Sequence, residues 1–151
     1  MKIRKRQRSG MIMRETVLLI NFEDQKQLRE LKMILFTLKI RMKKVEKEDY
    51  LQQIGYLAGI KEMEGIESVY EGEELEKEMM VFAGISNQRL DQILLMMRKN
   101  GVKRVDYKAI LTETNKTWTV PRLYEEISKE HGDYEEKSVN KIFYDNDRRE
   151  A

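Results

Sequence analysis

Cysteine is absent from this chain of 151 residues, and histidine and proline occur once each. Without cysteine there is no disulfide, no thiolate metal ligand and no nucleophilic thiol. A single histidine, His131, argues against a histidine zinc site and against a serine–histidine relay. No apolar run reaches the roughly 18 residues that a membrane span needs, and no signal-type apolar segment follows the basic N-terminus. We therefore expect a cytoplasmic protein with no membrane partner, no metal and no cofactor.

Charge is abundant but unevenly distributed. Charged residues make up 37% of the chain, well above the usual share, and the net charge is +2. Residues 1–10 contain five basic side chains and no acidic one. We expect residues 1–15 to form a basic, disordered arm, residues 16–132 a single domain with a mobile acidic loop at 60–78, and residues 133–151 a charged tail.

Two short segments, 16–22 and 79–83, are almost continuously apolar, which predicts strands buried on both faces. A basic, alternating segment at 40–45 predicts an edge strand, and a further strand should end near Leu111. Helical spacing of apolar residues follows each central strand. The order of strand, capped helix, turn, strand and helix occurs twice, with a period of about 62 residues between Val17 and Met79, which is a weak internal repeat.

Alternating strands and helices favour an α/β fold with a small, mainly parallel sheet of four strands in the order 2-1-3-4 and helices on both faces. The alternative is a ferredoxin-like α+β sheet in the order 4-1-3-2, which also centres the first and third strands. In the parallel sheet, the loops at Asp24, Ser86 and Thr112 lie at one end. In the alternative, Asp24 lies opposite the other two.

Ligands of open parallel sheets bind beyond the carboxyl ends of the strands, where the strand order reverses. Helix N-termini at that rim could receive an anion through their N–H groups. Lys108 could add a positive charge from its strand, and Trp118, the only tryptophan, follows the loop. The candidate ligand-binding residues are Asp24, Ser86, Lys108, Thr112, Thr114, Asn115 and Trp118, with Asn21, Glu23 and Asn87 nearby on the rim.

The same residues also have a purely structural interpretation. Thr and Asn at a junction between strand and helix are the usual caps and Asx turns, and Trp118 can cover the core. Neither a glycine-rich fingerprint nor a Walker lysine sequence is present, so nucleotide binding of the common kinds has no support. Glu126, Glu130 and His131 lack partner ligands of suitable spacing, and no metal site is assigned.

The stretch from Lys108 to Trp118 reads Lys-Ala-Ile-Leu-Thr-Glu-Thr-Asn-Lys-Thr-Trp, and Glu130-His131 follows at the end of the next helix. It resembles the bacterial domain-of-unknown-function family DUF3783, whose pattern is Lys-Ala-Val/Ile-Leu-Thr-x-Thr-Asn-x-x-Trp. The resemblance covers about residues 79–131, and Gln53 to Gly59 also looks similar. Glu113 stands where the family pattern has proline. The family carries no established activity to transfer.

Three hypotheses of function follow, in order of preference. The first is a non-enzymatic binding or regulatory domain that receives a small anion or a protein segment at the loop from Thr112 to Asn115. The second is an enzyme that uses a buried Lys108 with Glu125 or Asp24. The third is a nucleic-acid accessory that uses the arm at residues 2–8, although the acidic remainder of the chain does not extend a basic footprint. The oligomeric state is left open.

Overall fold

The computed structural model describes residues 13–132. The predicted basic arm therefore lies almost wholly, and the predicted C-terminal tail wholly, outside the described residues. The strands are β1 (Thr16–Ile20), β2 (Arg41–Val45), β3 (Met79–Ala83) and β4 (Tyr107–Ile110). The helices are α1 (Gln25–Thr37), α2 (Ile54–Ala58), α3 (Asn87–Lys99) and α4 (Val120–Glu130), with short 3₁₀ turns η2 (Lys47–Asp49) and η3 (Asn115–Thr117).

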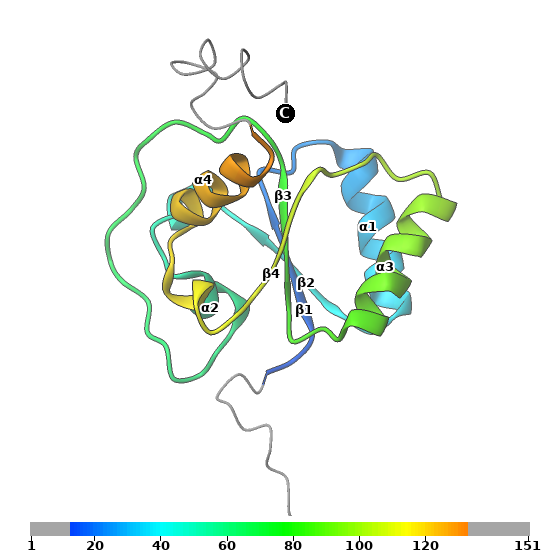
Figure 1. Cartoon of the computed structure of the whole chain (residues 1–151), viewed down its shortest axis with the longest axis horizontal. Coiled ribbons are helices and arrows are strands. Elements are labelled where there is room, and N and C mark those ends of the chain that lie inside the picture. The colour runs from blue at the N-terminus through cyan, green and yellow to red at the C-terminus, as the bar shows by residue number, and fades with distance from the viewer. Residues whose placement is uncertain (1–12, 133–151) are drawn as a thin grey trace, which may run out of the picture.

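The four strands form one sheet in the order β2-β1-β3-β4, as predicted. β1 pairs with β2, and β3 with β4, in parallel, so the sheet is mainly parallel. Helices α1 and α3 cover one face, and α2 and α4 cover the other (Figure 1). Every residue of β1 and β3 is buried, because both strands are central and both faces are covered.

The central pair, β1 and β3, is antiparallel, with Leu18 opposite Val81 at its middle. A pseudo-two-fold axis at this point relates the two halves of the molecule. It explains the internal repeat seen in the sequence, because each half is a β-α-β-α unit. It also corrects the prediction that the loops at Asp24, Ser86 and Thr112 share one end of the sheet.

Matching positions of the two halves adopt matching backbone geometry. Lys39 and Gly101 both have positive φ, 59° and 66°, immediately after α1 and α3. The following residues donate equivalent hydrogen bonds back into each helix, Ile40 to Leu35 at 2.8 Å and Val102 to Met97 at 3.0 Å. Both helices therefore end in the same left-handed C-terminal motif.

The halves also join at the start of their second helices. Gln53 and Thr119, the residues that precede α2 and α4, form an antiparallel bridge with each other. Ile54 N–H donates to the Trp118 carbonyl at 2.9 Å, and Val120 N–H donates to the Tyr50 carbonyl at 3.1 Å. Each half thus supplies a partner for backbone groups at the other half's helix start, which would otherwise need one.

Residues 60–78 form a loop around the outside of α2 and α4, without strand or helix beyond its first turn (Figure 1). Several hydrogen bonds fix it to the domain. The Gln52 amide donates to the Ile66 carbonyl and accepts from the Ile66 N–H, both at 2.8 Å. The Tyr50 hydroxyl donates to the Glu74 carboxylate at 2.6 Å, and Asn21 donates to the Leu75 carbonyl at 2.8 Å. These bonds set the path of the loop from α2 to β3.

Candidate functional site

Two of the seven predicted site residues are helix caps. The Asp24 carboxylate accepts from the N–H groups of Lys26 and Gln27 at 3.0 and 3.1 Å, at the start of α1. The bond from Gln27 leads the effects that lower the pKa of this carboxyl. The Ser86 hydroxyl accepts from the Arg89 N–H at 3.2 Å, at the start of α3. Both side chains therefore have the local structural role that their position at a strand–helix junction predicts.

Asp24 does not meet the other predicted residues. Because β1 runs antiparallel to β3, its carboxyl end lies at the opposite end of the sheet from the carboxyl ends of β3 and β4. Ser86 and Thr112 follow β3 and β4 and share one end. Asp24, with Asn21 and Glu23, lines a different, charged cavity at the other end. The predicted convergence is thus wrong for the first strand–helix junction and correct for the other two.

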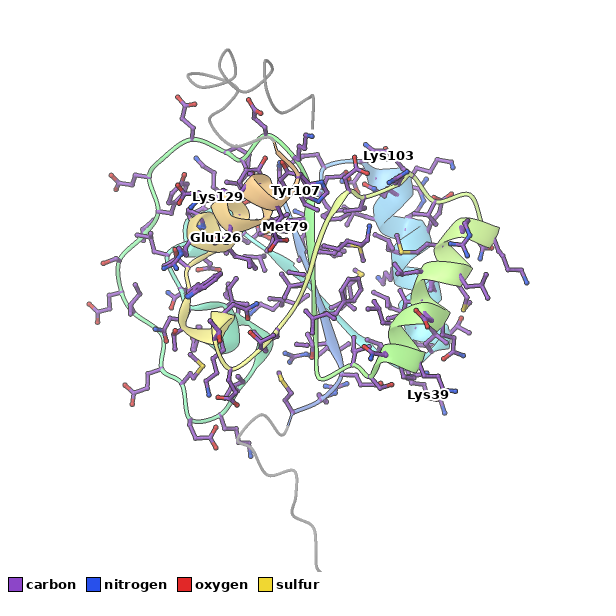
Figure 2. The ribbon with its side chains drawn as sticks, in the orientation of Figure 1. Lys39, Met79, Lys103, Tyr107, Glu126 and Lys129 are labelled. Carbon is purple, nitrogen blue, oxygen red and sulfur yellow. The ribbon has the colours of Figure 1, made fainter. Side chains whose placement is uncertain are left out.

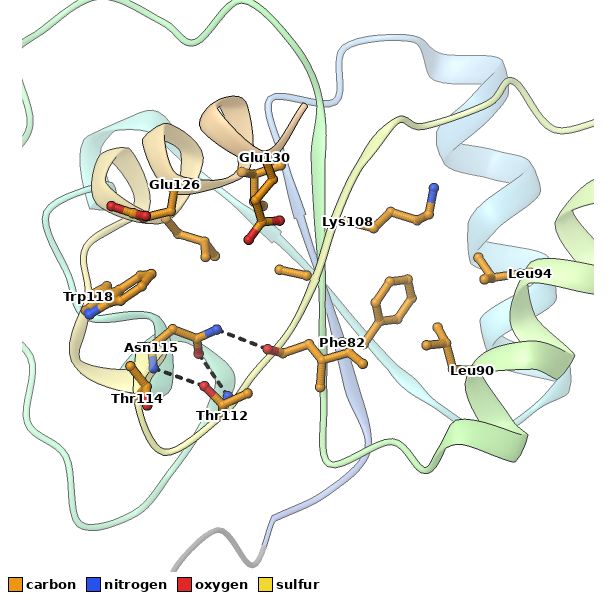
Figure 3. A pocket seen from close by; sticks show the side chains of 14 residues that line it. Phe82, Leu90, Leu94, Lys108, Thr112, Thr114, Asn115, Trp118, Glu126 and Glu130 are labelled. Carbon is orange, nitrogen blue, oxygen red and sulfur yellow. Dashed lines mark hydrogen bonds between the residues drawn. The ribbon is translucent and has the colours of Figure 1, made fainter. Parts of the chain in front are cut away.

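The other five predicted residues line one cavity of about 430 Å³, which surrounds the outer edge of β4 between α3 and α4 (Figure 3). Its lining combines apolar side chains of both helices with polar and charged ones: Phe82, Leu90, Leu94, Lys108, Ala109, Ile110, Thr112, Thr114, Asn115, Trp118, Leu123, Glu126, Ile127 and Glu130. β4 is the last strand of the sheet, so the cavity lies beside a strand edge that has no neighbour within the described residues.

The amide of Asn115 covers one part of this edge. Its oxygen accepts from the Thr112 N–H at 2.9 Å, and its nitrogen donates to the Ile110 carbonyl at 3.0 Å. A peptide group of a neighbouring strand would make the same pair of bonds, so Asn115 stands in for one. In return, the Thr112 hydroxyl accepts from the Asn115 N–H at 3.1 Å (Figure 3).

These bonds change the interpretation of the loop. The Thr112 and Asn115 groups that an anion would need are already paired with each other and with the end of β4. Asn115 is buried, with 9% of its surface exposed. The loop therefore terminates the strand, which is the capping role that Asn and Thr were also expected to have.

The remaining part of the β4 edge is uncovered. Leu111 N–H donates to the Phe82 carbonyl at 2.9 Å, so alternate residues of β4 direct their backbone groups toward β3. Lys108 and Ile110 direct theirs outward. Within residues 13–132, no hydrogen bond reaches the N–H or C=O of Lys108 or the N–H of Ile110. Three backbone groups in a row are thus available to an added strand.

Apolar side chains border this open edge. Ile110 is 43% exposed, on the α3 side of the sheet, and Leu90 and Leu94 of α3 are half-buried beside the cavity. Trp118 lies on the α4 side, where the Arg122 guanidinium stacks on its ring at 4.2 Å from the centroid. The edge therefore has an aliphatic wall on one side and an aromatic wall on the other.

Charges of opposite sign face the two sides of β4. Lys108 extends toward α3, and its amine donates to the Val105 carbonyl at 2.6 Å (Figure 3). Partial burial lowers the pKa of this amine, and the nearby Arg104 lowers it further. Glu126 and Glu130 of α4 line the other side. The exposed Lys108 has no carboxylate partner within the described residues, so this geometry gives no support to an acid–base pair built on it.

Ile110, Leu94 and Glu130 are the site residues that the sequence reasoning did not select. Ile110 reads as one more apolar residue of a strand, and its exposure depends on β4 being the last strand. Leu94 lies at the margin of an apolar helix stripe that is wider than a buried face needs, which is the one available signal. Glu130 was considered only as a metal ligand, and residues 13–132 contain no group of three or more acidic, His or Cys side chains placed to hold a metal.

Comparison with known proteins assigns a family to one part of the chain. Residues 78–134 match the family described as "Domain of unknown function (DUF3783)". The match contains β3, α3, β4 and α4, and it confirms the resemblance based on the Lys108 to Trp118 motif; it does not extend to Gln53–Gly59. No curated protein matches the chain, and no solved structure does. Within the described residues, no helix has the length and apolar character to cross a bilayer. Residues 78–134, which include the second β-α-β-α unit, thus match the DUF3783 family model.

Proposed function

We propose that this protein is a non-enzymatic binding domain that receives an extended segment of another protein along the open edge of β4. An added strand would bond to the outward backbone groups of Lys108 and Ile110. Its side chains would enter the cavity between α3 and α4. Binding of this kind, β-augmentation, takes affinity from main-chain hydrogen bonds and specificity from pockets for alternate side chains.

The observation that carries the proposal is the uncovered edge itself, beside a cavity with apolar walls. Exposed strand edges are usually blocked, because they promote association with other chains. A protein segment fits this place better than a small anion does, because the Thr112 and Asn115 groups are occupied and carboxylates line one side. An enzyme built on Lys108 and a nucleic-acid accessory built on residues 2–8 remain weaker alternatives. The latter residues lie outside the described part of the chain.

The test removes one outward backbone donor without disturbing the sheet. In Ile110→Pro the lost N–H points away from β3, so the β3–β4 ladder is kept, and proline is tolerated on strand edges in this orientation. Peptides selected from a random display library against the wild-type chain should bind Ile110→Pro at least about tenfold more weakly, because one hydrogen bond and the fit of the edge are lost. Fluorescence of Trp118 provides the binding signal.

The matched control is Met42→Pro on β2, the other edge of the sheet. Arg41 N–H bonds toward β1, so the Met42 N–H also points outward. Selected peptides should bind this variant as they bind the wild type. Peptides that bind Ile110→Pro undiminished, with both variants folded by circular dichroism, would show that docking does not use the β4 edge.

A further inference from the structure

The two sides of the β4 edge carry different charges, and this difference restricts which segment can dock. Lys108 points toward α3, where Leu90 and Leu94 lie (Figure 3). Ile110, two residues further along β4, shares that side of the sheet. Trp118 and Glu130 lie on the α4 side. Successive residues of an added strand alternate between these sides, so each side selects a separate set of partner side chains.

We propose that the occupant of the β4 edge is an extended segment with an acidic residue opposite Lys108, an aliphatic residue beside Ile110, and a basic residue on its other face, toward Glu130. This inference rests on the proposed function and adds the chemistry of the partner. It concerns a strand of a different protein, since a second copy of this chain does not meet these requirements.

The acidic position follows from the surroundings of Lys108. Residues directly opposite on neighbouring strands have Cβ atoms about 5 Å apart on the same face, so their charges interact. The Lys108 amine bonds to a neutral carbonyl, and the repulsion from Arg104 acts on it more strongly than the attraction of Asp106. A partner carboxylate would therefore add the ion pair that Lys108 does not make within residues 13–132.

The basic position follows from Glu130. The neighbouring Glu126 already has cations within reach, Arg122 at 3.6 Å and Lys129 at 3.5 Å (Figure 2). Glu130 is exposed and makes no ion pair within residues 13–132, and its carboxylate is directed toward the cavity (Figure 3). A lysine or arginine from the α4-facing set of an added strand would compensate this charge.

A second copy fits poorly in each register that pairs these outward groups about a two-fold axis. With the axis at Lys108, the two lysines lie directly opposite each other, and like charges in that position are destabilising. With the axis at Ala109 or at Ile110, each Ile110 carbonyl has to accept from the other chain, but the Asn115 amide already occupies that place. An acidic segment of another protein avoids both conflicts.

The test uses two synthetic nine-residue peptides without tryptophan or tyrosine. The first alternates valine and glutamate on one face and carries lysine on the other; the second exchanges glutamate and lysine. Titrations monitored by Trp118 fluorescence use the full chain, the double variant Lys108→Glu/Glu130→Lys, and Lys44→Glu on β2 as the matched control. The wild type should prefer the first peptide by about threefold to tenfold, the scale of two exposed ion pairs, and the double variant should reverse the preference. Lys44→Glu should prefer the first peptide over the second, as the wild type does.

Three results would overturn the inference. In the first, the wild type binds both peptides equally while Ile110→Pro binds both more weakly. This result would keep docking at the β4 edge but reject the requirement for an acidic residue opposite Lys108 and a basic residue toward Glu130. Binding of both peptides that Ile110→Pro does not weaken would instead remove the proposed function. A wild-type dimer in analytical ultracentrifugation that Ile110→Pro dissociates would identify a second copy as the occupant.

Discussion

The two edges of the sheet occupy equivalent places in the pseudo-two-fold arrangement but differ in the helix residue that lies beside them. On the α1 side of β2, the residues that face outward are Met42 and the exposed Lys44, with Lys32 on the nearby helix. On the α3 side of β4, Ile110 and Lys108 face outward, and Leu94 stands where α1 has Lys32. Lysines on an edge discourage pairing with other chains. The β2 edge thus has two lysines on or beside it, whereas the β4 edge has one lysine and a neighbouring leucine.

The ends of the two edge strands differ as well. After β4, Asn115 uses its side chain to cover the last outward groups of the strand. After β2, Glu46 directly precedes the turn η2, and its side chain makes no capping hydrogen bond. The open part of the β4 edge is therefore short and has a defined end, which fixes where a docked segment can lie.

The largest expected effect on this comparison comes from Asn115→Ala. The change removes the partner of the Ile110 carbonyl and of the Thr112 N–H at the partly buried end of β4, at a cost of about 2 kcal/mol in the free energy of unfolding. Urea denaturation measures it. Glu46→Ala, at the start of the corresponding turn, should change stability by less than about 0.5 kcal/mol. Equal effects at the two positions would mean that Asn115 does not seal the strand end.

A smaller effect is expected at the helix ends that the two halves share. Gly101→Ala places a side chain at φ 66° and should lower the free energy of unfolding by about 1 kcal/mol. Lys39→Gly relieves the same strain at φ 59° and should stabilise the chain by up to about 1 kcal/mol. Thermal unfolding of both variants tests the equivalence of the halves. A lower melting temperature for Gly101→Ala with a higher one for Lys39→Gly would support it, and a change in the same direction for both would contradict it.

The smallest effect concerns the ties between the halves. Arg89 of α3 bonds to Glu15 at 2.9 Å and to the Leu38 carbonyl at 2.6 Å. At the matching position in α1, Gln27 bonds to Glu78 at 3.2 Å and to the Lys103 carbonyl at 3.3 Å. One half therefore uses an ion pair where the other uses a neutral amide as the donor.

This difference predicts a dependence on pH. The hydrogen bond from Arg89 holds the pKa of the Glu15 carboxyl below the usual value of a glutamate. A lowered pKa in the folded state contributes stability above the unfolded pKa, and that stability is lost as pH falls through the folded pKa. Glu15→Gln should therefore lower the free energy of unfolding at pH 7 by less than about 1 kcal/mol, because the pair is partly exposed. The difference from the wild type should shrink as pH falls through the lowered pKa of Glu15 and vanish in acid below it. Glu23→Gln is the control, and a deficit that persists in acid would exclude the ion pair as its origin.

The order of the four strands could be predicted from the sequence, but the relative direction of the two central strands could not. The apolar runs beginning at Thr16 and Met79 identify the central strands because only covered strands tolerate such runs. The same runs suit parallel and antiparallel neighbours equally when helices cover both faces. Pairing direction depends on how the long segment 60–78 returns the chain to β3, and that segment has no pattern that fixes its path.

The candidate site also contains residues that the sequence predicts and residues that it does not. Lys108, Thr112, Asn115 and Trp118 come together because they follow one another along one strand and its turn. The prediction for Asp24 was wrong because the end of the sheet at which Asp24 lies depends on the relative direction of β1 and β3. Glu130 and Leu94 were missed because they reach the cavity from separate helices, and only the packed structure brings them to the β4 edge.

The antiparallel pairing of β1 with β3 also bears on how the chain acquires its structure. Partners in this pair are separated by roughly 60 residues of sequence, and contacts of such separation form late because a long loop must close first. As the chain leaves the ribosome, β1 can pair with β2, but its other edge and the N–H of Ile54 have no partners until β3 and then Trp118 emerge. Truncation before residue 118 should therefore yield a species that stays bound to chaperones, because neither repeat can shield its own central strand.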